Sequence, residues 1–125
     1  MMAWYTASII IAIRPRDEPN SDFLVHENLL LIDARTASEA RVAARKLGEE
    51  EATLDDDLTI DGLPAVREFI GVRKIVTVSN PHPMNQDQNR PADGTEVSYS
   101  VYRVSDRSAL QRLASGESVE VEYLE

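Results

Sequence analysis

The alternation of apolar and polar residues predicts a β-hairpin at the start of the chain. The segment from Trp4 to Ile13 is rich in aromatic and β-branched residues and ends just before Pro15, which is typical of a strand. A second strand is predicted from Val25 to Ala34, and the intervening loop is short enough for the two strands to pair. The first strand carries, in alternation, Tyr5, Ala7, Ile9, Ile11 and Ile13 on one face and Trp4, Thr6, Ser8, Ile10 and Ala12 on the other.

A helix is predicted to follow, from Ala37 to about Leu47. Thr36 and Glu39 have the spacing of a capping box, in which a hydroxyl and a carboxylate accept hydrogen bonds from the first backbone N–H groups of a helix. Gly48 either ends this helix or is followed by another turn through Ala52. The predicted buried stripe of the helix consists of Ala40, Ala43, Ala44 and Leu47.

The second half of the chain predicts two further strands separated by a polar segment. The third strand is predicted from Ala65 to Val78, and the fourth from Thr95 to Val104, where polar and apolar residues alternate. Residues 79–94 hold three prolines and almost no apolar side chain, so we expect a mobile excursion there. The predicted apolar faces are Val66, Ile70, Val72, Val76 and Val78 on the third strand and Val97, Tyr99 and Val101 on the fourth.

A short helix and a last strand complete the predicted fold. Ser105 or Asp106 is the predicted N-cap of the helix, and Gly116 is the glycine that closes it. Residues 119–123 alternate and end the chain as a strand. We therefore predict a single α+β domain over residues 1–125, with a mainly antiparallel sheet of about five strands and two helices on one face. The predicted order is β-β-α-β-β-α-β, a ferredoxin-like fold with an extra N-terminal strand.

Composition narrows the class of protein. With 42% hydrophobic and 28% charged residues, the chain has the balance of a globular protein rather than a disordered one. It has no apolar run near the ~20 residues that cross a bilayer, and its N-terminus lacks the basic region of a secretory signal. The absence of cysteine excludes disulfides, zinc-thiolate sites and thiol catalysis. We expect a cytoplasmic protein with no membrane partner.

The net charge of −9 bears on possible partners. Nucleic acid is not expected as a partner, because proteins bind it largely through Lys and Arg on the phosphates. An acidic run within residues 49–57 is either a solvated surface or a docking site for a basic protein partner. The acidic residues of this run are Glu49, Glu50, Glu51, Asp55, Asp56 and Asp57.

Residues dispersed over the predicted strands and first helix carry a resemblance to a known family. They are Trp4, Tyr5, Ala7, Ser8, Glu27, Leu29 to Ile32, Ala34, Glu39, Ala40, Ala44, Gly48, Phe69, Val72 and Asp93 to Val97. In this pattern the chain resembles, over roughly residues 4 to 102, a family of small bacterial proteins known as domain of unknown function 4288. The resemblance implies no activity, cofactor or catalytic residue. It implies that the last twenty-odd residues are an addition to the family's usual pattern.

The segment from Asp57 to Glu68 matches the template of a calcium-binding loop. Oxygen ligands at Asp57, Thr59 and Asp61 are followed by a turn glycine and a final glutamate. Against calcium, Pro64 removes a backbone N–H that such loops need, and a strand rather than a helix is predicted to follow. The alternative is an acidic loop that leads into the third strand, and we predict no metal or cofactor.

Polar residues on the predicted strands form a candidate ligand or interface site. If the strands pair in the expected register, one sheet face gathers Trp4, Thr6, Ser8, His26, Asn28, Ser98, Ser100 and Tyr102. A pair of His26 with Ser8 would supply a base and a nucleophile, but no acid or tight turn orients it. We therefore predict no catalytic residue.

The second strand favours self-association. Leu30 and Ile32 face one side of the predicted sheet while Leu29 and Leu31 face the other, and helices on one face cannot cover both pairs. We expect a homodimer joined through the sheet face opposite the helices, in a non-enzymatic protein-interaction module. The alternative is a small enzyme or ligand-binding domain that uses the face around His26.

Overall fold

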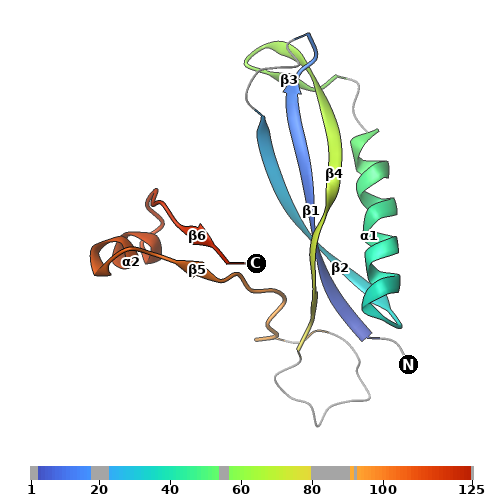
Figure 1. The fold of residues 1–125 in the computed structure, drawn as a ribbon. Coiled ribbons are helices and arrows are strands. Elements are labelled where there is room, and N and C mark those ends of the chain that lie inside the picture. The colour runs from blue at the N-terminus through green and yellow to red at the C-terminus, as the bar shows by residue number, and fades with distance from the viewer. Residues whose placement is uncertain (1–2, 18–22, 54–56, 80–90, 92, 125) are drawn as a thin grey trace.

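The computed structural model describes residues 3–17, 23–53, 57–79, 91 and 93–124. A long twisted sheet carries one helix against one face, and the C-terminal part of the chain projects from the other side (Figure 1). Most of the predicted excursion at 79–94 lies outside the described residues. The elements are β1 (Ala3–Pro15), β2 (Leu24–Ala34), α1 (Ala37–Ala52), β3 (Thr59–Ile60), β4 (Leu63–Thr77), β5 (Tyr102–Arg103), α2 (Arg107–Ala114) and β6 (Glu122–Tyr123).

The four-stranded sheet has the order β2-β1-β4-β3, with every neighbouring pair antiparallel. The predicted hairpin of β1 with β2 is confirmed, and α1 connects β2 to the hairpin of β3 and β4 on the other side of β1. The central place of β1 follows from its sequence, because both of its faces become buried. Ile9 is fully buried on the α1 side, and Ser8 is 1% exposed on the other.

The α+β class and the mainly antiparallel sheet are confirmed, but the ferredoxin-like order is wrong. The predicted extra strand, β1, is the centre of the sheet. Among the described residues, the one backbone bridge between the sheet and the segment from Thr95 to Val104 is that of Ser79 with Glu96. The two helices do not share a face either, because α2, β5 and β6 form a separate projection (Figure 1). Accordingly, the side chains predicted on the core side of the fourth strand are 41–51% exposed: Val97, Tyr99 and Val101.

Helix α1 begins as its sequence predicts, and of the two predicted ends it has the later one. The Thr36 hydroxyl accepts a hydrogen bond from the Glu39 backbone N–H at 3.1 Å, which confirms the cap. The helix continues to Ala52, and its buried residues are Ala40, Ala44 and Gly48. The predicted stripe was wrong at Leu47, which is 44% exposed. The stripe is shifted because Gly48 lies directly over a side chain of β4.

Gly48 is a point of close approach rather than a helix cap. An ideal Cβ built on Gly48 would lie 2.4 Å from two ring carbons of Phe69. Since Cβ atoms do not approach other carbons so closely, only glycine fits the observed spacing of α1 and β4 at this point.

Two β-bulges change the alternation of β4. The pairing with β1 passes from Ser8–Lys74 to Ile9–Val72, and from Ile10–Gly71 to Ile11–Phe69. One residue of β4 is therefore skipped at each step, Arg73 at the first and Ile70 at the second. This places Val72 and Phe69 on the α1 side. The predicted single apolar face of Val66, Ile70, Val72, Val76 and Val78 is wrong for this reason.

The segment that matches a calcium loop is a β-hairpin. Asp61 and Gly62 both have positive φ, 51° and 79°, as the central residues of a type I′ turn do, and they join β3 to β4. Glu68, the twelfth residue of the template, lies within β4 opposite Ala12 and 3.9 Å from the Arg14 guanidinium. The residues at the ligand positions of the calcium template therefore do not surround a common point at which a cation could bind.

The C-terminal projection is a small hairpin closed by α2, here called the arm (residues 101–124). The Asp106 carboxylate accepts a hydrogen bond from the Ala109 N–H at 2.8 Å, which identifies it as the N-cap. Gly116, at φ 82°, and the next residue donate to the last carbonyls of α2, as in a Schellman motif. Both predicted ends of this helix are confirmed. Among the described residues of the arm, only Ala109 is buried.

Candidate functional site: the open face of the sheet

The side of the sheet opposite α1 is here called the open face. Residues directly opposite each other in an antiparallel pair point to the same side, so the register defines its members. Ser8 is opposite Leu29 on one side and Lys74 on the other. Thr6 is opposite Leu31. Polar side chains therefore lie over the centre of this face, on β1, and leucines lie toward its outer strand, β2.

Residues 97–100, here called the crossing segment, cover the centre of the open face. The Thr6 hydroxyl donates a hydrogen bond to the carbonyl of Val97, and the Lys74 ammonium donates to the carbonyl of Tyr99. These contacts bury Thr6 to 3% exposure. The Thr6 hydroxyl of β1 and the Lys74 ammonium of β4 thus satisfy backbone carbonyls of a segment that leaves the sheet.

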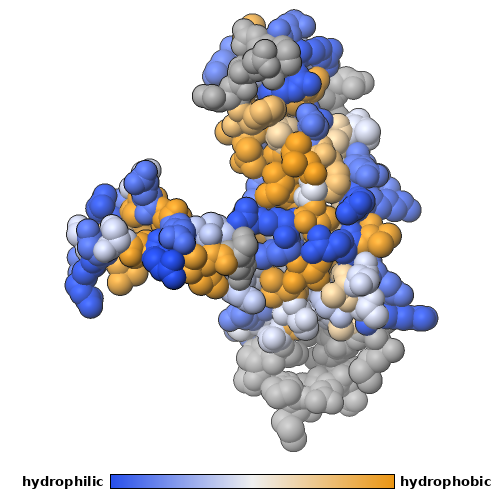
Figure 2. All heavy atoms as spheres, in the orientation of Figure 1, coloured by the Kyte–Doolittle hydropathy of each residue, from blue (hydrophilic) through white to orange (hydrophobic). Residues whose placement is uncertain are grey.

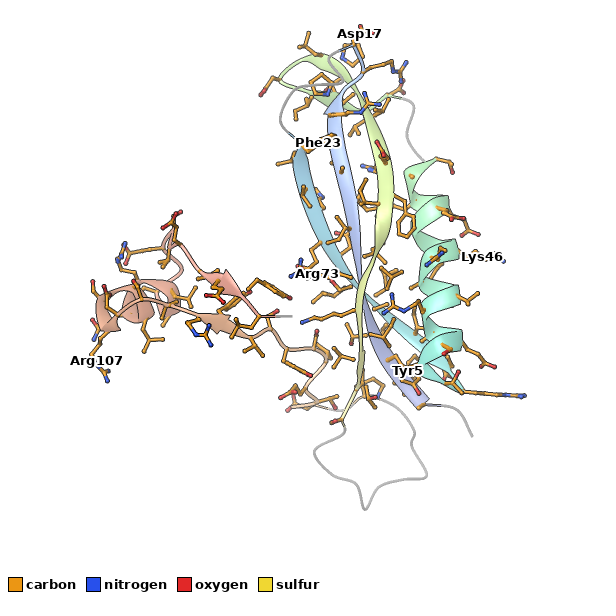
Figure 3. The ribbon with its side chains drawn as sticks, in the orientation of Figure 1. Tyr5, Asp17, Phe23, Lys46, Arg73 and Arg107 are labelled. Carbon is orange, nitrogen blue, oxygen red and sulfur yellow. The ribbon has the colours of Figure 1, made fainter. Side chains whose placement is uncertain are left out.

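A group of charged and aromatic side chains joins the arm to the sheet. The Glu27 carboxylate accepts a hydrogen bond from the Ser8 hydroxyl and lies 4.0 Å from the Arg73 guanidinium. Arg73, which the bulge in β4 turns toward the arm (Figure 3), stacks on the ring of Tyr123 with its central carbon 3.6 Å from the ring centroid. The Lys74 ammonium lies 5.8 Å from the same centroid.

A cleft of about 250 Å³ lies between the crossing segment and the sheet. Its charged side chains, Glu27 and Lys74, both already bind protein groups. Ser8 lies below the cleft, but at 1% exposure it is shielded from a substrate. The arrangement is therefore suited to holding the crossing segment in place. The cleft is lined by Glu27, Leu29, Lys74, Val97, Ser98, Tyr99 and Ser100.

The structure separates the site residues predicted from the sequence. Trp4, Thr6 and Ser8 lie on the open face, as expected for alternate residues of β1. His26 and Asn28 pair with Ile11 and Ile9, so they lie on the α1 side, where the Asn28 amide donates to the Glu51 carboxylate at 3.2 Å. The prediction that these residues share one face of the sheet is thus wrong, and His26 is not placed to act as a base on Ser8. The last predicted residue, Tyr102, lies in the arm, with its ring 5.4 Å from that of Tyr123.

An apolar strip remains uncovered on the open face. Val25, Leu29 and Leu31 of β2 are 53%, 54% and 49% exposed. Figure 2 shows apolar side chains gathered both over the sheet and along the arm. The sequence predicted the two-sided leucines of β2, but it did not single out Glu27, Arg73 or Tyr123.

A second hollow, of about 520 Å³, lies beside α1 at the outer edge of β4. Its two basic residues are Arg41 and Arg45, and the Arg41 guanidinium donates to the carbonyl of Val72 at 3.0 Å. The acidic run at the end of α1 is described only in part, since residues 54–56 lie outside the described residues. A basic protein partner for that run stays a prediction.

Tyr123 is expected to ionise at lower pH than an ordinary tyrosine. Its hydroxyl lies 3.3 Å from the Ser100 hydroxyl, and this hydrogen bond, followed by contacts with Lys74 and Arg73, holds its pKa below 10.0. Because the pKa is lower in the folded chain, ionised Tyr123 stabilises the fold at pH above 10, and this contribution is lost as the pH falls through the lowered pKa. Difference absorbance of tyrosinate between the native protein and Tyr123→Phe measures this pKa. Ser100→Ala should raise it, and an unchanged pKa near 10 in both proteins would contradict the assignment.

Comparison with known proteins gives one match. The family model described as domain of unknown function (DUF4288) matches residues 4–97. No curated protein and no solved structure matches the chain. The matched range ends at the first residue of the crossing segment, so the arm lies outside it. Within the described residues, no helix is long and apolar enough to cross a membrane.

Proposed function

We propose, for a chain that belongs to the family called domain of unknown function 4288, a non-enzymatic role as a protein-interaction module that self-associates through the open face. The apolar strip of Val25, Leu29 and Leu31 carries this proposal. An antiparallel sheet with one solvated face normally alternates to polar residues there, and β2 does not. Burial of one leucine side chain contributes about 1.5–3 kcal/mol, so covering this strip favours association.

The alternative, a small enzyme or ligand-binding domain around His26, has weaker support. His26 and Ser8 point to opposite sides of the sheet, so they do not form a base and nucleophile pair. The cleft under the crossing segment is the remaining candidate for a small ligand, and its charged groups are already bound to the protein. The apolar strip, by contrast, is about half exposed in the part of the chain that the structure describes.

We expect the native chain to scatter light as a dimer at micromolar concentration, at twice its single-chain mass of 14.0 kDa. Leu29→Glu combined with Leu31→Glu should reduce the mass to that of one chain, because the dimer would bury two charges from each chain without partners. Val42→Glu is the matched control: Val42 is 70% exposed on α1, and its substitution should leave the dimer unchanged. A native chain that scatters as a monomer contradicts the proposal, as does a face variant that remains dimeric.

A further inference from the structure

Side chains of the sheet hold the C-terminal part of the chain in place. Residues 97–124, which are the crossing segment and the arm together, are here called the strap. Thr6 and Lys74 donate hydrogen bonds to carbonyls of the crossing segment, and Arg73 stacks on Tyr123 of the arm. In the part of the chain that the structure describes, no backbone hydrogen bond joins the strap to the sheet.

The arm keeps its own hydrogen bonds without the sheet. The Leu124 N–H donates to the Val101 carbonyl at 3.0 Å, and the Arg103 guanidinium lies 3.1 Å from the Glu122 carboxylate. Helix α2 is capped at both ends by residues of the arm. Of the described residues of the arm, only Ala109 is buried. Moving the arm away from the sheet therefore breaks few contacts, and segments of this kind open at the lowest cost in free energy.

The first bulge of β4 builds the attachment of the strap. Consecutive residues of a regular strand point to opposite sides of the sheet. Because the bulge skips Arg73, both Arg73 and Lys74 reach the ring of Tyr123, with cationic groups 3.6 and 5.8 Å from its centroid. The Tyr123 hydroxyl also lies 3.3 Å from the hydroxyl of Ser100 in the crossing segment. One tyrosine thus connects the sheet, the crossing segment and the arm.

We propose that Tyr123 is the latch of a strap that opens and closes over the centre of the open face while β1 to β4 stay folded. In the closed state the strap covers the polar centre of this face, where Thr6 is 3% and Ser8 is 1% exposed. In the open state both hydroxyls become accessible beside the apolar strip. The inference goes beyond the proposed function and does not depend on self-association.

A single cysteine measures the opening, because the chain has none of its own. Ser8→Cys places a thiol between Leu29 and Lys74, two residues that line the cleft under the crossing segment. Ala7→Cys is the matched reference, on the same strand and fully buried on the α1 side. In the native chain a small thiol reagent should modify Ser8→Cys faster than the unfolding free energy of that variant, measured in urea, allows. Ala7→Cys should react only at the rate that global unfolding sets.

The latch itself is tested in the Ser8→Cys background. Arg73→Met and Tyr123→Leu each remove the contact between cation and ring, so each should accelerate labelling about 2- to 30-fold, the range for one cation–π contact. Arg103→Met is the matched control, because it removes a cation that pairs with Glu122 inside the arm, and it should leave the rate unchanged. All these chains retain the apolar strip, so self-association affects their rates alike.

Three results would overturn the inference. Labelling of Ser8→Cys at its own rate of global unfolding would mean that the strap opens only with the sheet, and this comparison stands even if Ala7→Cys does not fold. An unchanged rate in both Arg73→Met and Tyr123→Leu would exclude Tyr123 as the latch. Equal acceleration in Arg103→Met would trace the effect to the stability of the arm. None of these results bears on the proposed function, which light scattering tests separately.

Discussion

Replacing Ile9 with alanine is expected to lower the free energy of unfolding by about 2–5 kcal/mol. Ile9 lies at the middle of the central strand, fully buried against Ala40 and Ala44 of α1 and the neighbouring strands. The loss combines the transfer energy of the missing methyl groups with the cavity that they leave. Domains are stable by only about 5–15 kcal/mol, so urea denaturation followed by circular dichroism will resolve the change easily.

Ile70→Ala is the matched control for this substitution. Ile70 is the residue skipped at one bulge of β4, and 55% of it is exposed. Its truncation should cost less than about 1 kcal/mol, in keeping with surface substitutions. Equal losses at the two positions would mean that the bulge does not turn Ile70 out of the core.

The second large effect is expected at Gly48. Alanine there would gain about 1 kcal/mol of helix propensity, but its Cβ would overlap the ring of Phe69. Overpacking of this kind costs about 1–3 kcal/mol, so after the gain in propensity we expect Gly48→Ala to destabilise the fold by up to about 2 kcal/mol. The midpoint and slope of urea unfolding measure the change.

A double-mutant cycle separates the two contributions. In the Phe69→Ala background the ring is absent, so adding Gly48→Ala should stabilise the protein by up to about 1 kcal/mol. Gly71→Ala serves as a further control, because an ideal Cβ at Gly71 has no neighbour within 4 Å. If Gly48→Ala is destabilising to the same extent in both backgrounds, the contact with Phe69 is not its cause.

Local features of the fold could be predicted from the sequence because local interactions specify them. Thr36 and Asp106 bind backbone N–H groups three residues ahead, so their capping roles depend on few other contacts. The alternation of β1 is likewise visible in the sequence, since one side of the strand is almost wholly apolar. The dipeptide Asp61-Gly62 is also a local signal, because Asp-Gly is typical of a tight hairpin and the same residues fit the calcium template.

The sheet order and the candidate site depend on contacts that the sequence pattern does not specify. The alternation of polar and apolar residues from Thr95 to Val104 indicates an extended segment with one polar and one apolar side. It does not specify which edge or face of the sheet that segment contacts. The bulges in β4 change which residues share a face, so Arg73 reaches Tyr123 from a position that simple alternation would assign differently. The predicted face of Ser8 with His26 failed because a shift of one residue in register exchanges the two sides of a strand.

The bulges of β4 also shape the exposed edge of this strand. Among the described residues, β3 pairs with β4 only at Leu63 and Pro64. The rest of the outer edge of β4 therefore exposes backbone groups that a strand of another chain could pair with. A flat edge of this length is a template for open-ended stacking of chains. In this protein the two β-bulges interrupt the regular edge of β4, and the Arg41 guanidinium donates a hydrogen bond to the carbonyl of Val72, which lies between the bulges. Addition of a further strand along the hydrogen-bonding direction is thereby disfavoured at this edge.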